Sequence, residues 1–185
     1  MARHVCPIWV GYLLTNPLRK ILNNPDTLLR PYVTEGMTAL DVGCAMGFFS
    51  LPLARLVGPS GKVICVDVQQ RMLRKLENRT EKAGLSSRIE THLCQSDSLC
   101  LQDHDGSVDF ILAFAVMHEV PFPQKIFAEL KGTLRARGRL FVAEPKVHVS
   151  KTDFEKTIST VERAGFKVVS RPTVAWNRAV LMEGT

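Results

Sequence analysis

The chain has 185 residues, 45% of them hydrophobic and 23% charged, which is ordinary for a globular protein with one substantial core. Its formal net charge of +6 allows an anionic partner, but the basic residues are spread along the chain without a dense run. No apolar run approaches the roughly 20 residues that a membrane span needs. Five scattered cysteines without a Cys-x-x-Cys pair exclude a zinc ribbon or a thioredoxin-type motif and fit a reducing cytoplasm.

The first 30 residues precede any regular alternation of strand and helix. Pro17 and Pro25 interrupt this stretch, which predicts a helical segment broken at the prolines. His4 and Cys6 offer two soft ligands that could join a metal site with Cys44, His118 or His148. Two ligands separated by one residue are thin evidence, so we predict no metal site.

From residue 37 onward the hydrophobic pattern alternates between strand and helix. In chain order we expect a strand at 39–42, a helix at 48–57, a strand at 62–68, a helix at 69–83, strands at 88–93 and 108–114, a helix at 123–135, a strand at 139–143, a helix at 152–164 and strands at 166–170 and 179–182. Such alternation predicts a parallel sheet with helices on both faces. The connection between the last two strands is too short for a crossover helix, so the final strand should be antiparallel to the strand before it.

The segment Asp-Val-Gly-Cys-Ala-Met-Gly at 41–47 joins the first expected strand to the first expected helix. Gly43 and Gly47 permit positive φ and close approach of a ligand. A strand, a glycine loop and a helix in this order form a nucleotide site at the carboxyl edge of a parallel sheet. Asp67 ends the second strand, where a carboxylate can accept both ribose hydroxyls of an adenosine.

The spacing Asp-x-Gly-x-x-x-Gly resembles motif I of the class I methyltransferases that use S-adenosyl-L-methionine (SAM). The likeness continues through the acid after the second strand and the ends of the third to fifth strands. Within this class the chain is similar to the methyltransferases of ubiquinone and menaquinone biosynthesis. This resemblance implies a Rossmann-like, doubly wound α/β sheet of seven strands, mostly parallel with an antiparallel C-terminal strand. It also implies one methyltransferase domain over 1–185, in which residues 1–30 cover the cofactor.

The resemblance implies that SAM binds and leaves as S-adenosyl-L-homocysteine. The cofactor contacts that it implies are Asp41, Gly43, Cys44, Gly47, Asp67, Val68, Gln69, Met72, Ser96, Asp97, Ser98, Ala113 and Phe114. Ala45 departs from the family, which often has glycine at this position. Alanine costs little there if φ is negative.

Methyl transfer from a sulfonium is an in-line displacement with an activated leaving group, so the enzyme mainly aligns the reactants and excludes water. A nucleophile that carries a proton also benefits from a base. The loop after the fourth strand offers His118, which titrates near neutrality, and Glu119, which can orient it or bind a cationic group. We predict both as catalytic, the alternative being that His118 caps the strand or contacts the methionine carboxylate.

A small-molecule acceptor is favoured, because the fourth strand lacks the Asn/Asp-Pro-Pro-Tyr motif of amino-group methyltransferases and no RNA-binding domain is appended. An RNA methyltransferase that uses the basic helix at 71–82, a protein methyltransferase and a non-catalytic SAM-binding sensor or partner subunit stay open as alternatives. A nicotinamide-binding Rossmann domain is disfavoured, since Ala45 replaces the second glycine of its fingerprint.

Overall fold

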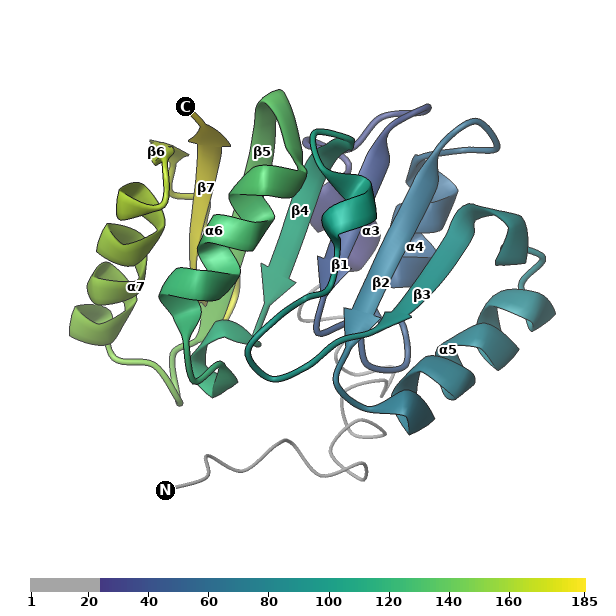
Figure 1. Ribbon diagram of the computed structural model, residues 1–185, viewed down its shortest axis with the longest axis horizontal. Coiled ribbons are helices and arrows are strands. Elements are labelled where there is room, and N and C mark those ends of the chain that lie inside the picture. The colour runs from purple at the N-terminus through teal and green to yellow at the C-terminus, as the bar shows by residue number, and fades with distance from the viewer. Residues whose placement is uncertain (1–23) are drawn as a thin grey trace. The chain divides into compact units, whose positions relative to one another are not determined.

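A computed structural model describes residues 24–185, which fall into two compact units, 24–94 and 95–185, with their elements labelled in Figure 1. Most of the expected N-terminal cap, including His4, Cys6 and Pro17, lies outside the described residues. The end of that segment is helix α3, Pro25–Leu29. Pro25 therefore begins a helix, at a position where its missing N–H costs nothing, and Asn24 Oδ1 caps the helix by accepting from Asp26 N at 3.0 Å.

The first unit contains three parallel strands in the order β3-β2-β1. After α3 its elements are β1 (Thr38–Val42), α4 (Ser50–Leu56), β2 (Lys62–Asp67), α5 (Gln70–Lys82), a short 3₁₀ turn (Ser86–Arg88) and β3 (Ile89–Leu93). Val42 pairs with Val66, so the carboxyl ends of β1 and β2 lie side by side. This register brings the strand-end carboxylates Asp41 and Asp67 to one edge of the unit, as the sequence predicts.

The second unit contains four strands in the order β4-β5-β7-β6. Its elements are a 3₁₀ turn (Gln102–His104), β4 (Val108–Phe114), a second 3₁₀ turn (Met117–Glu119), α6 (Pro123–Thr133), β5 (Leu134–Pro145), α7 (Lys151–Arg163), β6 (Phe166–Ser170) and β7 (Asn177–Gly184). Strands β4 and β5 are parallel, whereas β7 is antiparallel to both β5 and β6. The predicted antiparallel C-terminal strand is therefore confirmed.

Strand β5 begins five residues earlier than the expected 139–143, and the helix before it ends at Thr133 instead of Arg135. Residues 136–138, which the sequence leaves between a helix and a strand, belong to β5 and form a bulge inside it. Pairing with β4 jumps between Val108 and Phe110, and Arg137 adopts φ +64°. A side chain at Gly138 would lie 2.7 Å from Leu134 Cδ2, so glycine is required where the bulge crowds the backbone.

Each unit has its own hydrophobic core. In the first, Leu40, Ile64, Leu73 and Leu76 are fully or almost fully buried, and in the second the large buried side chains are Phe110, Phe127 and Phe141. The two units supply seven strands that are mostly parallel, which confirms the predicted α/β class. No helix within residues 24–185 is long and apolar enough to cross a membrane.

Candidate active site

The glycine loop that follows β1 is tied to the end of β2 through the Asp67 carboxylate. Oδ2 accepts the N–H of Ala45 at 2.9 Å, and Oδ1 accepts the N–H of Gln69 at 2.8 Å, just before α5. Burial raises the pKa of Asp67, while the hydrogen bonds from the Gln69 and Ala45 backbone oppose that rise. The predicted ribose-binding acid thus also joins the loop to the start of a helix.

Asp41 occupies the penultimate position of β1 and is buried. Its Oδ2 accepts a hydrogen bond from Ser50 Oγ, in the first turn of α4, at 2.6 Å. Burial raises the pKa of Asp41 to about 7, against the lowering effect of the Ser50 hydroxyl, and the charge of Asp67 adds to the rise. Asp41 therefore secures the strand-to-helix connection from inside the unit.

Three positions in the loop have positive φ: Gly43 at +70°, Ala45 at +46° and Gly47 at +81°. The sequence analysis allowed for a negative φ at Ala45, and that condition is not met, so alanine is strained there. Gly47 is required for a further reason. A Cβ at this position would lie 2.3 Å from Leu76 Cδ1 and 2.7 Å from Leu51 Cδ1, so the glycine lets the loop pack against α4 and α5.

The loop has a second anchor, which the sequence analysis missed. The guanidinium of Arg79, on α5, donates to the carbonyl oxygen of Met46. Partial burial lowers the pKa of Arg79. The sequence does not reveal this contact, because an arginine among other charged residues carries no signal of a partner 33 positions earlier in the chain.

The other predicted cofactor residues of this unit differ in exposure. Val68, directly after Asp67, is 41% exposed, whereas Met72 is buried on the inner side of α5. Cys44 is also buried, and burial together with the neighbouring Cys65 raises the pKa of its thiol well above the usual range. Cys44 is consequently a neutral thiol and not a nucleophile.

In the second unit, the predicted segment 96–98 forms a tight turn closed by a hydrogen bond from Gln95 N to Ser98 O at 2.9 Å. Asp97 pairs with Lys125 Nζ at 3.2 Å, near the start of α6. Glu129, which the sequence analysis did not single out, accepts the N–H of Leu99 at 2.6 Å and the hydroxyl of Ser98 at 3.2 Å. The turn is thus held by α6.

Strand β4 ends with the predicted residues Ala113 and Phe114, both buried. Ala115 then adopts φ +57° and donates to Ala143 O at 2.7 Å, which keeps the chain beside β5 as it turns away. This turn leads directly into the 3₁₀ segment Met117–Glu119, which carries both predicted catalytic residues.

His118 is held by Glu144, a buried residue near the end of β5. Glu144 Oε2 lies 2.5 Å from His118 Nδ1, and Glu144 Oε1 accepts the N–H of Met117 at 2.8 Å. Glu119, which we predict to orient His118 or to bind a cationic group, has its Oε1 3.9 Å from Nε2 of that ring. The His148 ring stacks on that of His118, with centroids 5.7 Å apart and planes 7° from parallel.

The sequence offered one signal for Glu144 that we did not use. It is a charged residue that directly follows the apolar run 140–143, a position that a parallel strand places at its carboxyl end. We had read this residue only as part of the fifth-strand pattern. That it contacts His118, 26 residues earlier, depends on the parallel pairing of β4 with β5.

A glycine loop fixed by a strand-end carboxylate, at the carboxyl edge of parallel strands, is typical of a Rossmann-like nucleotide-binding domain. The model of the methyltransferase domain family matches residues 33–177, and the chain belongs to this family. The predicted membership of a methyltransferase family is thereby confirmed.

Several known proteins are similar to this chain. A solved SAM-dependent methyltransferase from Aquifex aeolicus is 28% identical, with a TM-score of 0.86 over 98% of this chain and 100% of that one. An uncharacterised 37.1 kDa protein of transposon TN4556 from Streptomyces fradiae is 37% identical over 60% of this chain and 30% of its own length. A demethylmenaquinone methyltransferase from Lactobacillus johnsonii is 31% identical over 60% of this chain and 45% of its own length. The matched part is less than half the length of each of these curated relatives.

Proposed function

We propose that this chain, acting as a single methyltransferase domain, binds SAM and transfers its methyl group to a small-molecule acceptor. The observation that carries the proposal is the Asp67 carboxylate, which lies between the glycine loop and the start of α5 and bonds to both. Membership of the methyltransferase domain family supports it, as does the likeness to the SAM-dependent enzyme of Aquifex aeolicus.

Asp67 keeps the capacity to bind a ribose while it anchors the loop. Each carboxylate oxygen has two lone pairs, and each accepts one backbone N–H, so lone pairs remain for the ribose hydroxyls. The exposed Val68 beside it offers apolar surface to an adenine ring. We assign these two residues and Gln69 to the adenosine half of the cofactor.

The reaction is a displacement at the methyl carbon. The acceptor atom forms a bond to that carbon, the carbon–sulfur bond breaks, and its electron pair stays on sulfur to give S-adenosyl-L-homocysteine. An acceptor that carries a proton loses it to a base, and we assign that role to Nε2 of His118. We retain Glu119 as a residue that contacts the acceptor.

The small-molecule acceptor is supported by the name of the Lactobacillus johnsonii relative, a demethylmenaquinone methyltransferase. An RNA acceptor has weaker support than the composition suggested. Arg79 donates to Met46 O within its own unit, which removes it from the set of basic residues that face solvent on α5. We propose a cytoplasmic location, with which the free thiols of Cys44, Cys65, Cys94 and Cys100 are consistent.

The test is a label-transfer assay with purified protein, methyl-tritiated SAM and a bacterial extract split into small-molecule, RNA and protein fractions. We expect label in the small-molecule fraction and none with heat-denatured protein. Label only in RNA or protein would reject the proposed acceptor class. Binding of SAM without label in any fraction would instead favour a non-catalytic SAM-binding protein.

A further inference from the structure

We propose that Glu144 is a positioning residue that keeps a proton on Nδ1 of His118 and thereby makes Nε2 the nitrogen that takes a proton from the acceptor. The inference rests on the proposed function for its catalytic consequence. The arrangement itself, a buried carboxylate that sets the tautomer of a histidine, can be tested without any acceptor.

The carboxylate of Glu144 is 1% exposed and is engaged through both oxygens. A backbone N–H can only donate, so the 2.8 Å contact of Met117 N fixes Oε1 as an acceptor. The second oxygen, Oε2, is 2.5 Å from Nδ1 of the next residue, His118. Two donors from adjacent residues therefore converge on one carboxylate.

This convergence favours a proton on Nδ1. The Met117 N–H already donates to Oε1, and a protonated Nδ1 lets the second oxygen, Oε2, accept a hydrogen bond as well. Once Nδ1 carries the proton, a neutral imidazole has its lone pair on Nε2. The histidine is then a base at the nitrogen that points away from Glu144.

The ring is fixed on a second side by His148, which stacks on it nearly in parallel. Glu119 Oε1, at 3.9 Å from Nε2, is beyond hydrogen-bond distance of the nitrogen that would act as base. The charged and titratable groups that these contacts place around His118 are therefore Glu144, Glu119 and His148. Among them, Glu144 Oε2 is the hydrogen-bond partner of Nδ1.

Replacing Glu144 with Gln makes a sharp prediction, because an amide has one acceptor and one donor end. Met117 N–H requires the amide oxygen on its side, as it now requires Oε1. The amide NH₂ then faces Nδ1 and forces that nitrogen to accept, which moves the ring proton to Nε2. Nε2 of His118 can then no longer act as a base, although glutamine has the same shape as the glutamate it replaces.

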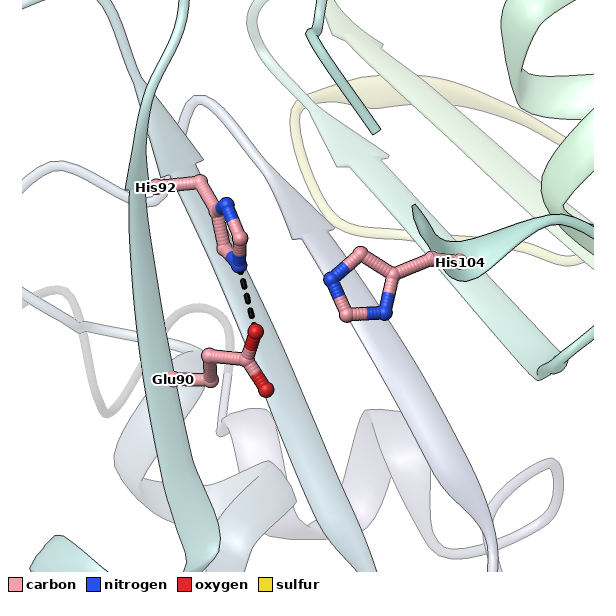
Figure 2. Close-up of side chains that lie close together, drawn as sticks. All are labelled: Glu90, His92 and His104. Atoms are coloured by element: carbon pink, nitrogen blue, oxygen red, sulfur yellow. Dashed lines mark hydrogen bonds and ion pairs between the residues drawn. The ribbon is translucent and has the colours of Figure 1, made fainter. Parts of the chain in front are cut away.

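The chain offers a matched control in the pair shown in Figure 2. On β3, in the first unit, His92 Nε2 lies 2.6 Å from Glu90 Oε1, so Glu90→Gln makes the same change next to another histidine. We assign neither residue a role in binding or chemistry. Glu90→Gln should leave methyl transfer unchanged, and the NMR chemical shifts of the His118 imidazole should also stay unchanged.

The experiment is two-bond ¹H–¹⁵N correlation NMR of the imidazoles in the wild-type chain and in Glu144→Gln, with His118→Gln to identify the signal. We expect His118 to be the Nδ1–H tautomer in the wild type and the Nε2–H tautomer in Glu144→Gln. An Nε2–H tautomer in the wild type would overturn the proposal, and this measurement stands even if Glu144→Gln does not fold. An unchanged tautomer in a folded variant would also overturn it.

Methyl transfer from tritiated SAM to reduced demethylmenaquinone, or to the small-molecule fraction that the wild type labels, completes the test. We expect Glu144→Gln to lower kcat by about 100-fold or more with the KM for SAM unchanged, because the histidine then has the wrong tautomer to act as a general base. A loss no larger than that of Glu90→Gln would reject the catalytic role. If the wild type labels nothing, the proposed function fails, whereas the NMR result still decides whether Glu144 sets the tautomer.

Discussion

The amide of Ala45 donates to Oδ2 of Asp67 at 2.9 Å, and this bond connects the middle of the glycine loop to the end of the neighbouring strand. The acid that the sequence assigns to the ribose is therefore also part of the loop's own structure. Changes at Asp67 should affect both the cofactor and the loop, since even an amide in place of the carboxylate leaves one of the two backbone N–H groups without its acceptor.

Asp67→Asn should weaken SAM binding by about 1–3 kcal/mol, since the amide loses the negative charge and one acceptor. Isothermal titration calorimetry with SAM measures this directly. Asp153→Asn, an exposed change on α7, is the control and should leave the affinity unaltered. Equal affinities for wild type and Asp67→Asn would reject the assignment of Asp67 to the ribose.

His118→Ala should reduce turnover while SAM affinity stays nearly unchanged, because we assign this side chain to the acceptor's proton and not to the cofactor. The reduction should be on the order of 10²–10⁴-fold, the usual contribution of a general base. The measurement is kcat together with the dissociation constant of SAM. A large loss of SAM affinity would identify His118 as a cofactor ligand, the alternative that the sequence left open.

Stability should fall with rising pH through the titration of Asp41. Its pKa is about 7 in the folded chain against 3.8 for the ordinary group, so the folded state binds the proton more tightly. The resulting stability is present below pH 4 and is lost as the pH rises to about 7, at about 1.4 kcal/mol per pKa unit.

Asp41→Asn removes this titration. Between pH 5 and pH 8, the free energy of unfolding of the variant should therefore rise relative to that of the wild type. Urea unfolding at several pH values gives the difference. Parallel curves for the two proteins would show that Asp41 does not have the raised pKa.

Ala45→Gly should stabilise the chain by up to about 1 kcal/mol. Alanine at φ +46° carries the cost of left-handed backbone, which exceeds the entropy that glycine adds to the unfolded state. Thermal and urea unfolding measure the change. Ala54→Gly, at a fully buried position in α4, is the opposite control and should destabilise by about 1 kcal/mol.

Gly47→Ala should destabilise by about 2–4 kcal/mol, because it combines backbone strain at φ +81° with a clash against Leu76 and Leu51. Gly84→Ala separates these two costs. Gly84 also has positive φ, at +66°, but no atom lies within 4 Å of its added Cβ, so this variant should lose only about 1–2 kcal/mol. Equal losses in both variants would mean that the clash at Gly47 is relieved.

Local sequence patterns were sufficient to predict the order of strands and helices, the antiparallel final strand and the glycine loop with its two strand-end acids. These features follow from local periodicity and from glycine at positive φ, so a single segment is enough to reveal each one. The same reasoning located His118 on the loop after β4. It misjudged β5, because a bulge at Arg137 and Gly138 resembles a turn when its partner strand is unknown.

Which side chains act together depends on contacts that form in the folded chain. Arg79 reaches the Met46 carbonyl across 33 residues, and Glu144 reaches His118 across 26, through the pairing of parallel strands and the packing of a helix. Glu119 is adjacent to His118 in sequence, yet Nδ1 of His118 donates its hydrogen bond to Glu144. Neighbours in sequence point in directions set by the local backbone, whereas a hydrogen bond depends on distance and angle in space, and the fold alone supplies these.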